Sequence, residues 1–576
     1  MAKYDKYPEV KVKGYDHCAW QDYDQITKVL EERLNSNSKN VVVVDCYPGV
    51  DVKEVVEGLS TLNFDKVIYS DECALQGEAL TAAIDAYLTE DRVFGVLTTK
   101  NFQDVFRAEK IEEAKVQLEQ AEGNVLVCGT GAGLITTGDI YIFADLARWE
   151  IQMRYRKGMS NWNVENSDAP ILTKYKRGFF VEWRMADRHK VANYKNFDYV
   201  LDTNVANEPK LVSGEAFFAG LHETAHRPFR VVPYFDAGVW GGQWMKEVCD
   251  LDREAENFAW GFDGVPEENS LYLRYGDVRI EVPSTNVVFY RPQALLGTKV
   301  HARFGTEFPI RFDFLDTMGG QNLSLQVHPL TEYIQQTFGM HYTQDESYYI
   351  LDCKEEAKVY LGVKEGIKPE EMIEDLKSAQ RGEMSFDAEK YINTFDVKKH
   401  DHFLIPAGTI HCSGKDTMVL EISATPYIFT FKLWDWDRLG LDGLPRPIHI
   451  EHGEKVIDWT RTTAWVEREL VNPIEQVAEG EGYIEERTGL HEREFIETRR
   501  HWFTETVHHT TQGSVNVLNL VEGEEAVVES PTGEFEPFVV HYAETFIIPE
   551  SVKAYTIRPH GPSVGKKLAT IKAYVR

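Results

Sequence analysis

The stretch Asn322–Pro329, NLSLQVHP, alternates polar and apolar residues and places Gln326 and His328 two positions apart. Side chains two positions apart in a β-strand point to the same face, so both can reach one site. Glu346 opens the strand-like run ESYYILD, and His411 ends the run PAGTIH. Two imidazoles, a carboxylate and an amide oxygen suit a divalent metal and leave one position open for substrate. The pattern predicts one zinc ion (Zn2+) per chain at these four residues.

Short alternating strands continue from about residue 227 to the C-terminus. Runs such as FPIRFDFLD, AKVYLGV, MVLEISA and SVNVLNLVE are separated by turn residues, which is typical of antiparallel all-β barrels. One helical interruption is expected at Lys368–Gln380, followed by Phe386–Asn393. We therefore expect a metal-binding barrel domain over residues 227–460, with a short helical insertion, and a second barrel over residues 461–576.

Residues 1–226 follow a different pattern. Continuous apolar runs, interpreted as buried strands, alternate with amphipathic segments such as Val52–Leu59 and Gln103–Glu122. Strands that are apolar on both faces and separated by helices imply a parallel sheet covered on both sides. The sequence thus predicts a multidomain protein, with an N-terminal α/β domain followed by all-β barrels. The expected N-terminal strands are Asn40–Asp45, Lys66–Ser70, Asn124–Cys128 and Asp139–Ala144.

The motifs around the expected metal ligands resemble those of class I mannose-6-phosphate isomerase, a cupin family. They are the QVHP strand, a glutamate that leads into a YIL strand, and the PAGxxH turn. The WGG run at Trp240–Gly242 and FKLWDWDR at Phe431–Arg438 are similar to further parts of that family. The resemblance begins near Tyr234 and is weak in the second barrel. It implies cupin (jelly-roll) barrels and a zinc-dependent isomerase that interconverts mannose 6-phosphate and fructose 6-phosphate through an enediol(ate).

The resemblance also implies roles for other side chains. Glu421, in the run MVLEIS, corresponds to an active-site glutamate of the family, and we expect a polar or acid–base role for it. Lys432 stands at the place of an active-site arginine. A lysine can donate to an enediolate, but it lacks the bidentate fork of arginine. Trp240 and Lys246 are expected among the substrate-binding residues.

Two basic positions of the family are altered in this chain. Asp313 and Gln344 stand where family members carry lysines, which removes positive charge that a phosphate group would need. Arg311 lies two residues before Asp313 on the same strand face, and it is our candidate for binding substrate phosphate. Its alternative role is a salt bridge to Asp313.

The N-terminal domain resembles the uridine kinase-like branch of nucleotide kinases in its strand order and in the segments Ile142–Gly158 and Phe179–Lys190. Such a kinase needs GxxxxGK[ST] after its first strand, because the glycine-rich backbone and the lysine hold the phosphates. This chain has DCYPGVDVKE there, with a single glycine and with Asp51 near the expected anion. The second glycine run, Gly129–Gly133, is a weak signal, since tight turns use glycine for backbone reasons. We expect a degenerate P-loop-fold domain without phosphoryl transfer.

Composition limits the partners and the location. The 62 basic and 93 acidic residues give a net charge of −31, which disfavours nucleic acid and anionic lipid as partners. No apolar run is long enough to span a bilayer, and the opening MAKYDKYPEV lacks a secretory pattern. The seven dispersed cysteines suit a reducing compartment. We expect a cytoplasmic protein that acts on a small sugar phosphate, and the oligomeric state stays open.

Two other functions fit the same residues. The altered basic positions are compatible with an isomerase of a related or unphosphorylated sugar. A catalytically weak sugar-sensing protein could instead use the barrel as a ligand-binding module, with the N-terminal domain as a second, non-catalytic effector site. Aldose–ketose turnover by the metal-loaded protein would separate both isomerases from the sensor.

The loop after the first N-terminal strand gives the first testable prediction. Asp45 and Asp51 flank a loop that has one glycine and no Lys-Ser/Thr pair, so Mg²⁺–ATP should neither bind tightly nor be hydrolysed. Calorimetric titration of the full chain with Mg²⁺–ATP checks this. Micromolar affinity that is abolished by Lys53→Ala would contradict the prediction and support a kinase.

Overall fold

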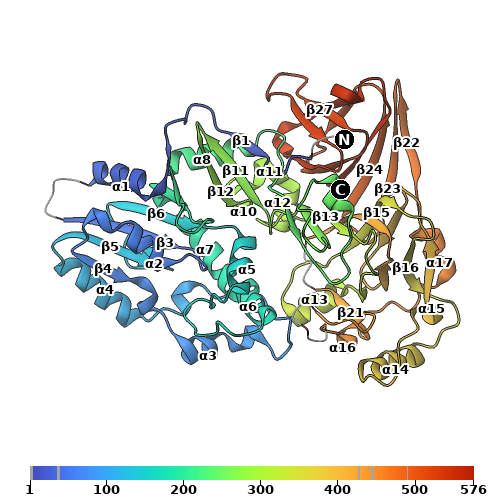
Figure 1. The fold of residues 1–576 in the computed structure, drawn as a ribbon, viewed down its shortest axis with the longest axis horizontal. Helices are drawn as coiled ribbons and strands as arrows, with labels where there is room; N and C mark the ends of the chain where they lie inside the picture. Colours follow the sequence, from blue (N-terminus) through green and yellow to red (C-terminus); the bar gives the residue numbers. More distant parts are fainter. Residues whose placement is uncertain (1–3, 35–38, 426–428, 441–442, 444–445, 490) are drawn as a thin grey trace. The chain divides into compact units, whose positions relative to one another are not determined.

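The computed structural model describes residues 4–34, 39–425, 429–440, 443, 446–489 and 491–576 (Figure 1). The chain divides into two compact units. We call Glu9–Thr224 with Ser270–Tyr290 the α/β unit, and Met1–Pro8, Ala225–Asn269 and Arg291–Arg576 the β unit. Within the described ranges, no helix is both long and apolar enough to cross a membrane.

The α/β unit is built on a seven-stranded sheet with the order β2-β8-β7-β6-β3-β5-β4. The run VVVV lies at the centre of this sheet, and its residues Val42–Val44 are fully buried, as expected for a strand covered on both faces. The neighbouring strands β7, β6, β3, β5 and β4 all pair in parallel. The sequence predicted a parallel sheet that contains β3, β4, β5 and β6. Their bounds are β3 (Lys39–Cys46), β4 (Lys66–Tyr69), β5 (Gly123–Gly129), β6 (Ile140–Asp145) and β7 (Tyr199–Asp202).

Two features of this unit were not predicted. The sheet ends in antiparallel strands, β8 (Lys210–Ser213) and β2 (Ala19–Gln21). A later segment also returns to the unit: β11 (Ser270–Tyr275) and β12 (Val278–Pro283) form a hairpin that pairs with β1 (Glu9–Lys11).

The returning segment falls within the range 227–460 that we expected for the metal-binding domain. It is anchored in the α/β unit by the hydroxyl of Tyr275, which donates to the main-chain oxygen of Ala216 at 3.0 Å, and by fully buried Leu271 and Leu273. Alternating strand residues give no sign of which sheet they will join, so this contact lay beyond sequence reasoning. The division into three domains remains a prediction.

The loop between β3 and α2 (Val52–Gly58) has its backbone donors occupied. Asp51 Oδ1 accepts from the main-chain nitrogens of Lys53 at 3.0 Å and Glu54 at 3.2 Å. These are the N–H groups that a helix N-terminus would otherwise offer to a phosphate. The Arg154 guanidinium donates to the main-chain oxygen of Gly49 at 2.9 Å. The loop therefore presents a carbonyl oxygen to this arginine.

The first barrel of the β unit has a six-stranded sheet, β18-β15-β20-β13-β10-β9, and a five-stranded sheet, β17-β16-β19-β14-β21. The bounds are β9 (Tyr234–Asp236), β10 (Trp260–Gly264), β13 (Ile310–Asp316), β14 (Leu325–Val327), β15 (Glu346–Cys353), β16 (Lys358–Val363), β17 (Ile392–Asp396), β18 (His402–Ile405), β19 (His411–Ser413), β20 (Thr417–Ala424) and β21 (Phe431–Trp434). The predicted helix at 368–380 is α14 (Pro369–Gln380). The second predicted helix is shorter, α15 (Ala388–Tyr391), because Ile392 already pairs within the sheet.

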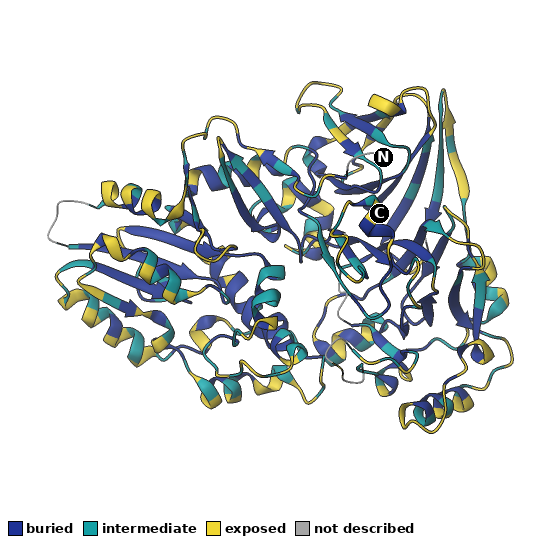
Figure 2. Ribbon diagram, in the orientation of Figure 1, coloured by how far each residue is buried: buried dark blue, intermediate teal, exposed yellow. Residues whose placement is uncertain are grey.

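The second barrel also consists of two sheets, β22-β23-β24-β31-β26-β29 and β25-β30-β27-β28. Their inward residues, among them Phe503, Leu518 and Ile557, form one buried hydrophobic cluster, which Figure 2 shows as dark blue on the inner strands. The bounds are β22 (Glu475–Gly480), β23 (Tyr483–Gly489), β24 (Ile496–Phe503), β25 (Val507–Thr510), β26 (Asn516–Glu522), β27 (Glu525–Glu529), β28 (Phe538–His541), β29 (Thr545–Ile548), β30 (Ala554–Pro559) and β31 (Leu568–Val575).

A buried ion-pair network ties the two barrels together. Arg230 donates to Asp263 of β10 at 3.0 Å and lies 2.9 Å from Glu544, which precedes β29. The three side chains are at most 2% exposed. The neighbouring Phe229 makes an antiparallel bridge with Ile547. The linking segment therefore joins the barrels through both its backbone and its guanidinium, consistent with one compact β unit.

Removal of the Arg230 guanidinium should destabilise the β unit strongly. Arg230→Ala leaves two buried carboxylates without their cation, and breaking such a pair costs about 3–5 kcal/mol. Denaturant unfolding of the variant, followed by a probe in the β unit, measures this loss. Arg253→Ala, at an exposed position of the same unit, is the control and should change the free energy of unfolding little. Equal stability of the two variants would contradict the role of the network.

Candidate metal centre

Two histidines and a glutamate converge inside the first barrel. Ligand atoms of His328, Glu346 and His411 all lie within 4.8 Å of one another. His328 Nε2 lies 2.9 Å from Glu346 Oε2, and His411 Nε2 lies 2.9 Å from Glu346 Oε1. All three residues are at most 1% exposed. Burial opposes ionisation of the carboxyl group, but the two facing imidazoles more than offset it and hold the pKa of Glu346 well below its ordinary value.

The two facing sheets supply these ligands. Gln326 of β14 lies directly opposite His411 of β19 in the five-stranded sheet, and His328 follows β14 immediately. Glu346 is the first residue of β15 in the six-stranded sheet. The predicted same-face spacing of Gln326 and His328 therefore holds, and the four predicted ligands meet at one point.

The contacts of His411 show why this cluster suits a cation. Its Nδ1 lies 2.9 Å from the main-chain oxygen of Thr409, which can only accept, so Nδ1 carries a proton. Its Nε2 faces Glu346 Oε1, and among the described residues that oxygen has no hydrogen-bond donor. His411 Nε2 and Glu346 Oε1 therefore face each other as two ligand atoms in a buried site. A backbone carbonyl on the other ring nitrogen is the usual orienting partner of a metal-binding histidine.

His328 has a similar environment. Its Nδ1 lies 3.5 Å from the main-chain oxygen of Phe429, while Nε2 faces the carboxylate. Burial lowers the pKa of His328, with the nearby His411 acting in the same direction. A neutral imidazole is the form that binds metal.

Gln326 can complete the set through its amide oxygen. Its Nε2 lies 3.1 Å from His411 Nε2, and its Oε1 accepts from Ser324 Oγ at 3.0 Å. The two ends of an amide are assigned by their hydrogen bonds. Exchanging them would turn Oε1 toward the cluster and let Nε2 donate to the serine hydroxyl. The residues therefore fit a divalent metal with two nitrogen and two oxygen ligands.

Glu421 stands beside the cluster and is fixed by neighbouring donors. Its Oε1 accepts from Ser423 Oγ at 2.8 Å and from Gln344 Nε2 at 3.0 Å. The same Gln344 nitrogen lies 3.0 Å from Glu346 Oε2, so one amide joins the two glutamates. Burial raises the pKa of Glu421 well above its ordinary value, and the charges of Asp313 and Glu346 add to this.

The structure places Arg311 between two carboxylates. Its guanidinium donates to Asp313 Oδ2 at 3.1 Å and to Glu421 Oε1 at 3.3 Å. Arg311 is 5% exposed. Burial raises the pKa of Asp313 to about 7, although Arg311 opposes the shift. Of the two roles predicted for Arg311, the salt bridge is the one that these contacts describe.

Lys432 lies in the same row of the sheet as two expected ligands. In the register of the five-stranded sheet, Gln326 pairs with His411 on one side and with Lys432 of β21 on the other. Directly opposed residues of neighbouring strands share a face. The half-buried Lys432 therefore shares the face of Gln326, and its active-site role remains a prediction.

Trp240 and Lys246 lie elsewhere in the barrel. The Trp240 ring packs 4.8 Å from that of Trp260, which pairs with Leu315 near the end of β13. By strand rise this end lies about 13 Å from Arg311. Lys246 donates to the main-chain oxygen of Glu256 at 3.0 Å. These contacts are with other parts of the barrel, and the substrate-binding role expected for the two residues remains a prediction.

The WGG run has a packing reason of its own. A Cβ on Gly242 would lie 2.1 Å from Asp316 Oδ1 and 2.6 Å from the main-chain nitrogen of Met318. Only glycine permits this close approach. The motif marks the fold of the barrel rather than a contact with the metal ligands.

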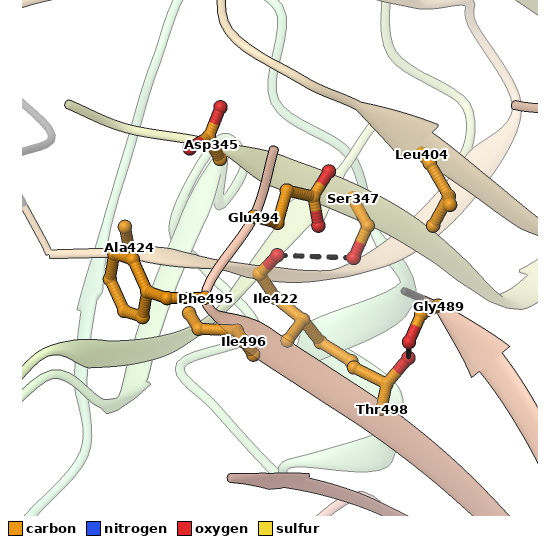
Figure 3. Close-up of a pocket in the computed structure, with 10 residues that line it drawn as sticks. All are labelled: Asp345, Ser347, Leu404, Ile422, Ala424, Gly489, Glu494, Phe495, Ile496 and Thr498. Atoms are coloured by element: carbon orange, nitrogen blue, oxygen red, sulfur yellow. Dashed lines mark hydrogen bonds between the residues drawn. The ribbon is translucent and has the colours of Figure 1, made fainter. Parts of the chain in front are cut away.

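Figure 3 shows a small cavity on the other side of the six-stranded sheet. Ser347 and Ile422 line it, and they alternate along their strands with Glu346 and Glu421, so they point to the opposite face. Its volume is about 10 Å³, enough for about one water molecule. It is a packing gap between the two barrels rather than a substrate site.

Similarity to known proteins is divided along the chain. Residues 22–226 match the family described as "Domain of unknown function (DUF8485)". A stretch of 153 residues is 33% identical to "Probable mannose-6-phosphate isomerase GmuF" of Bacillus subtilis (strain 168), over 27% of this chain and 45% of that protein. A stretch of 156 residues is 33% identical to "Mannose-6-phosphate isomerase ManA" of the same organism, again over 27% of this chain and 45% of that protein.

The chain therefore spans less than half the length of these two curated relatives. Among solved structures, the mannose 6-phosphate isomerase of Bacillus subtilis superposes with a TM-score of 0.49 and 18% sequence identity. That superposition covers 61% of this chain and 100% of the other.

Metal analysis tests the site directly. Purified wild type should contain one equivalent of divalent metal, and His328→Ala/His411→Ala should lose it, because two of the four donors are gone. Plasma mass spectrometry of the dialysed proteins measures the content. His508→Ala, at an exposed position of β25, should keep full occupancy. Full occupancy of the double variant would overturn the assignment.

Proposed function

We propose that the β unit is a zinc-dependent aldose–ketose isomerase that interconverts mannose 6-phosphate and fructose 6-phosphate. The observation that carries the proposal is the Glu346 carboxylate, whose two oxygens each face an imidazole nitrogen at 2.9 Å. Glu421, joined to Glu346 through Gln344, supplies a second carboxyl group beside that point. The printed names of the two Bacillus relatives, mannose-6-phosphate isomerases, support the same reaction.

Aldose–ketose exchange moves a proton between C2 and C1 of the open-chain sugar through an enediol(ate). The site must therefore stabilise negative charge on the oxygens of C1 and C2 and hold a group that carries the proton. When bound, zinc supplies Lewis-acid stabilisation of that charge. We assign its retention to Gln326, His328, Glu346 and His411.

We assign the proton-carrying role to Glu421. Ser423, Gln344 and Arg311 all donate to its Oε1, which fixes the carboxyl group and leaves Oε2 to exchange a proton with the sugar. Arg311 and Asp313 act as positioning residues in this scheme, since they reach the site through Glu421. Lys432 is assigned a donor role toward the enediolate oxygens, as a point charge rather than a bidentate fork.

One observation favours a second candidate, the isomerisation of an unphosphorylated sugar. The guanidinium proposed to bind phosphate is held by Asp313 and Glu421, and Gln344 puts a neutral amide where the family carries a lysine. This pocket thus has less positive charge for a phosphate than the resemblance implies. Relative kcat/KM for mannose 6-phosphate and mannose distinguishes the two candidates.

The α/β unit is proposed to be a degenerate kinase-like domain without phosphoryl transfer. The capping of the α2 N-terminus by Asp51 supports this, because it occupies the donors that a phosphate would need. We place the isomerase in residues 227–460 and the second barrel in residues 461–576. Within the first range, the segment Ser270–Tyr290 packs in the α/β unit and is assigned a structural role.

Turnover tests the proposed activity. The metal-free chain is reloaded with zinc and incubated with mannose 6-phosphate, and fructose 6-phosphate is measured by a coupled assay. The proposal predicts conversion in both directions that is lost on chelation and restored by metal. Absence of aldose–ketose exchange with both the phosphorylated and the free sugar would contradict the proposed isomerase activity. It would favour a sugar-binding protein instead.

Glu421→Gln tests the proton carrier separately. The amide keeps the acceptor oxygen for its three donors but cannot exchange a proton, so kcat/KM should fall about 10²–10⁴-fold with the metal retained. Steady-state kinetics and metal content are measured together. Glu355→Gln, an exposed carboxylate in the same barrel, should match wild type. Unchanged kcat/KM in Glu421→Gln would remove Glu421 from the mechanism.

A further inference from the structure

The α/β unit contains a cavity of about 530 Å³, a size typical of small-molecule sites. We call it the α7 cavity, because one face of helix α7 (Trp183–Asn193) forms its largest wall. The helix residues that line it are spaced at three and four positions, from Met185 to Asn193. The 3₁₀ turn Phe102–Asp104 and the residues Gly133 and Leu134 form the other walls.

The α7 cavity lies at the carboxyl ends of two neighbouring parallel strands. Gly133 follows β5, and His189 of the cavity wall reaches Asp45, the next-to-last residue of β3. Strands β3 and β5 pair directly. The crevice outside the carboxyl ends of the strands is where open α/β sheets bind their ligands.

A buried carboxylate holds two of the residues that line the cavity, Gly133 and His189. Asp45 is 0% exposed and accepts four hydrogen bonds. Two come from the main-chain nitrogens of Gly131 at 3.0 Å and Gly133 at 3.1 Å, one from the Tyr141 hydroxyl at 2.5 Å, and one from His189 Nε2 at 2.6 Å. The imidazole of the cavity wall is thereby held in one orientation.

This arrangement explains the glycine run Gly129–Gly133. A Cβ on Gly133 would lie 2.5 Å from the Tyr141 hydroxyl oxygen and 2.8 Å from Asp45 Oδ2, so a side chain there would break the cluster. Gly131 has a φ of +74°, which favours glycine. The loop is shaped to present its N–H groups to Asp45, not to a phosphate.

His189 lines the cavity and has one ring nitrogen that does not contact Asp45. Burial lowers the pKa of His189, but the Asp45 carboxylate more than offsets this, so the pKa is raised above its ordinary value. Nε2 faces Asp45 Oδ2 at 2.6 Å, so Nδ1 is the ring nitrogen that this carboxylate leaves for another partner. The nearest partner, Asn193 Nδ2 at 3.4 Å, already donates to the main-chain oxygen of His189, and Asn193 Oδ1 accepts from Asn196. Among the described residues, Nδ1 therefore has no partner that can accept a hydrogen bond from it.

Arg188 offers a second donor at the rim. Its Nε donates to Asn101 Oδ1 at 3.0 Å, and its NH2 group donates to the main-chain oxygens of Thr98, at 3.1 Å, and Lys100. These bonds fix the plane of the guanidinium. Its NH1 group has no hydrogen-bond partner within the described part of the chain, so it can bind a ligand without rearrangement.

We propose that the α7 cavity binds a small organic anion. A carboxylate or phosphate-ester oxygen accepts from Arg188 NH1 and His189 Nδ1, and the apolar part of the ligand packs against Met185 and Leu134. Charge-assisted hydrogen bonds of this kind are strong and directional. The site is separate from the loop at Gly49, where Asp51 occupies the donors.

Calorimetry of the full, metal-loaded chain tests the proposal with three probes that share a phenyl body. Benzoate carries a carboxylate, phenyl phosphate carries a phosphate ester, and benzamide is neutral. We expect one binding event per chain for at least one of the two anions, with a dissociation constant of about 1 mM or tighter, and none for benzamide. Which anion binds more tightly identifies the anionic group that the cavity prefers.

Two variants locate the binding event. Arg188→Gln should weaken it about 10- to 100-fold, and Arg156→Gln, an exposed arginine on α5 (Arg148–Arg156), should leave it unchanged. Ala192→Trp, at an exposed wall position, should fill the cavity and abolish binding without changing its charge. No binding of either anion, or wild-type affinity in both Arg188→Gln and Ala192→Trp, would overturn the proposal.

Discussion

Two imidazole nitrogens converge on the two oxygens of one buried carboxylate, and the rest of the first barrel holds them there. Because His411 directs Nδ1 at the main-chain oxygen of Thr409, its Nε2 faces Glu346 in a region that solvent does not reach. Burying such a set of polar groups costs free energy, which a bound cation would offset. The arrangement therefore suits a metal centre. The facing sheets that position the ligands are the scaffold for that centre.

Burial links this centre to the groups around it. In a low-dielectric interior, charges influence one another over longer distances than at the surface. Glu346, Glu421 and Asp313 place three carboxyl groups near one guanidinium, and Glu421 and Asp313 have raised pKa values as a result of burial and mutual repulsion. Gln344 connects two of these groups as a neutral donor. A metal ion would reduce the local negative charge, so metal binding and the proton chemistry at Glu421 should be coupled.

The convergence of the expected metal ligands could be predicted from the sequence because strand geometry determines where the side chains point. Gln326 and His328 share a face through two-residue spacing, and Glu346 and His411 begin the strands that oppose them. The role of Arg311 was left open between two partners, since a sequence shows which residues share a face but not which of them touch. The WGG run is ambiguous for a related reason: Gly242 is needed for packing against Asp316, and a packing motif has the same appearance in a sequence as a binding motif. The return of Ser270–Tyr290 to the α/β unit depends on long-range contacts, for which alternating strand residues carry no signal.

The glycine run Gly129–Gly133 also shows that a sequence does not reveal which residues are in contact. In the sequence it was a weak signal, and only the buried Asp45 gives its glycines a physical reason.

For the chain as a whole, the most direct test of the metal centre is a crystal structure with diffraction data collected above and below the zinc absorption edge. The account predicts one anomalous difference peak per chain, within bonding distance of His328, Glu346 and His411. A fully ordered site without such a peak, in a protein reloaded with zinc, would contradict it.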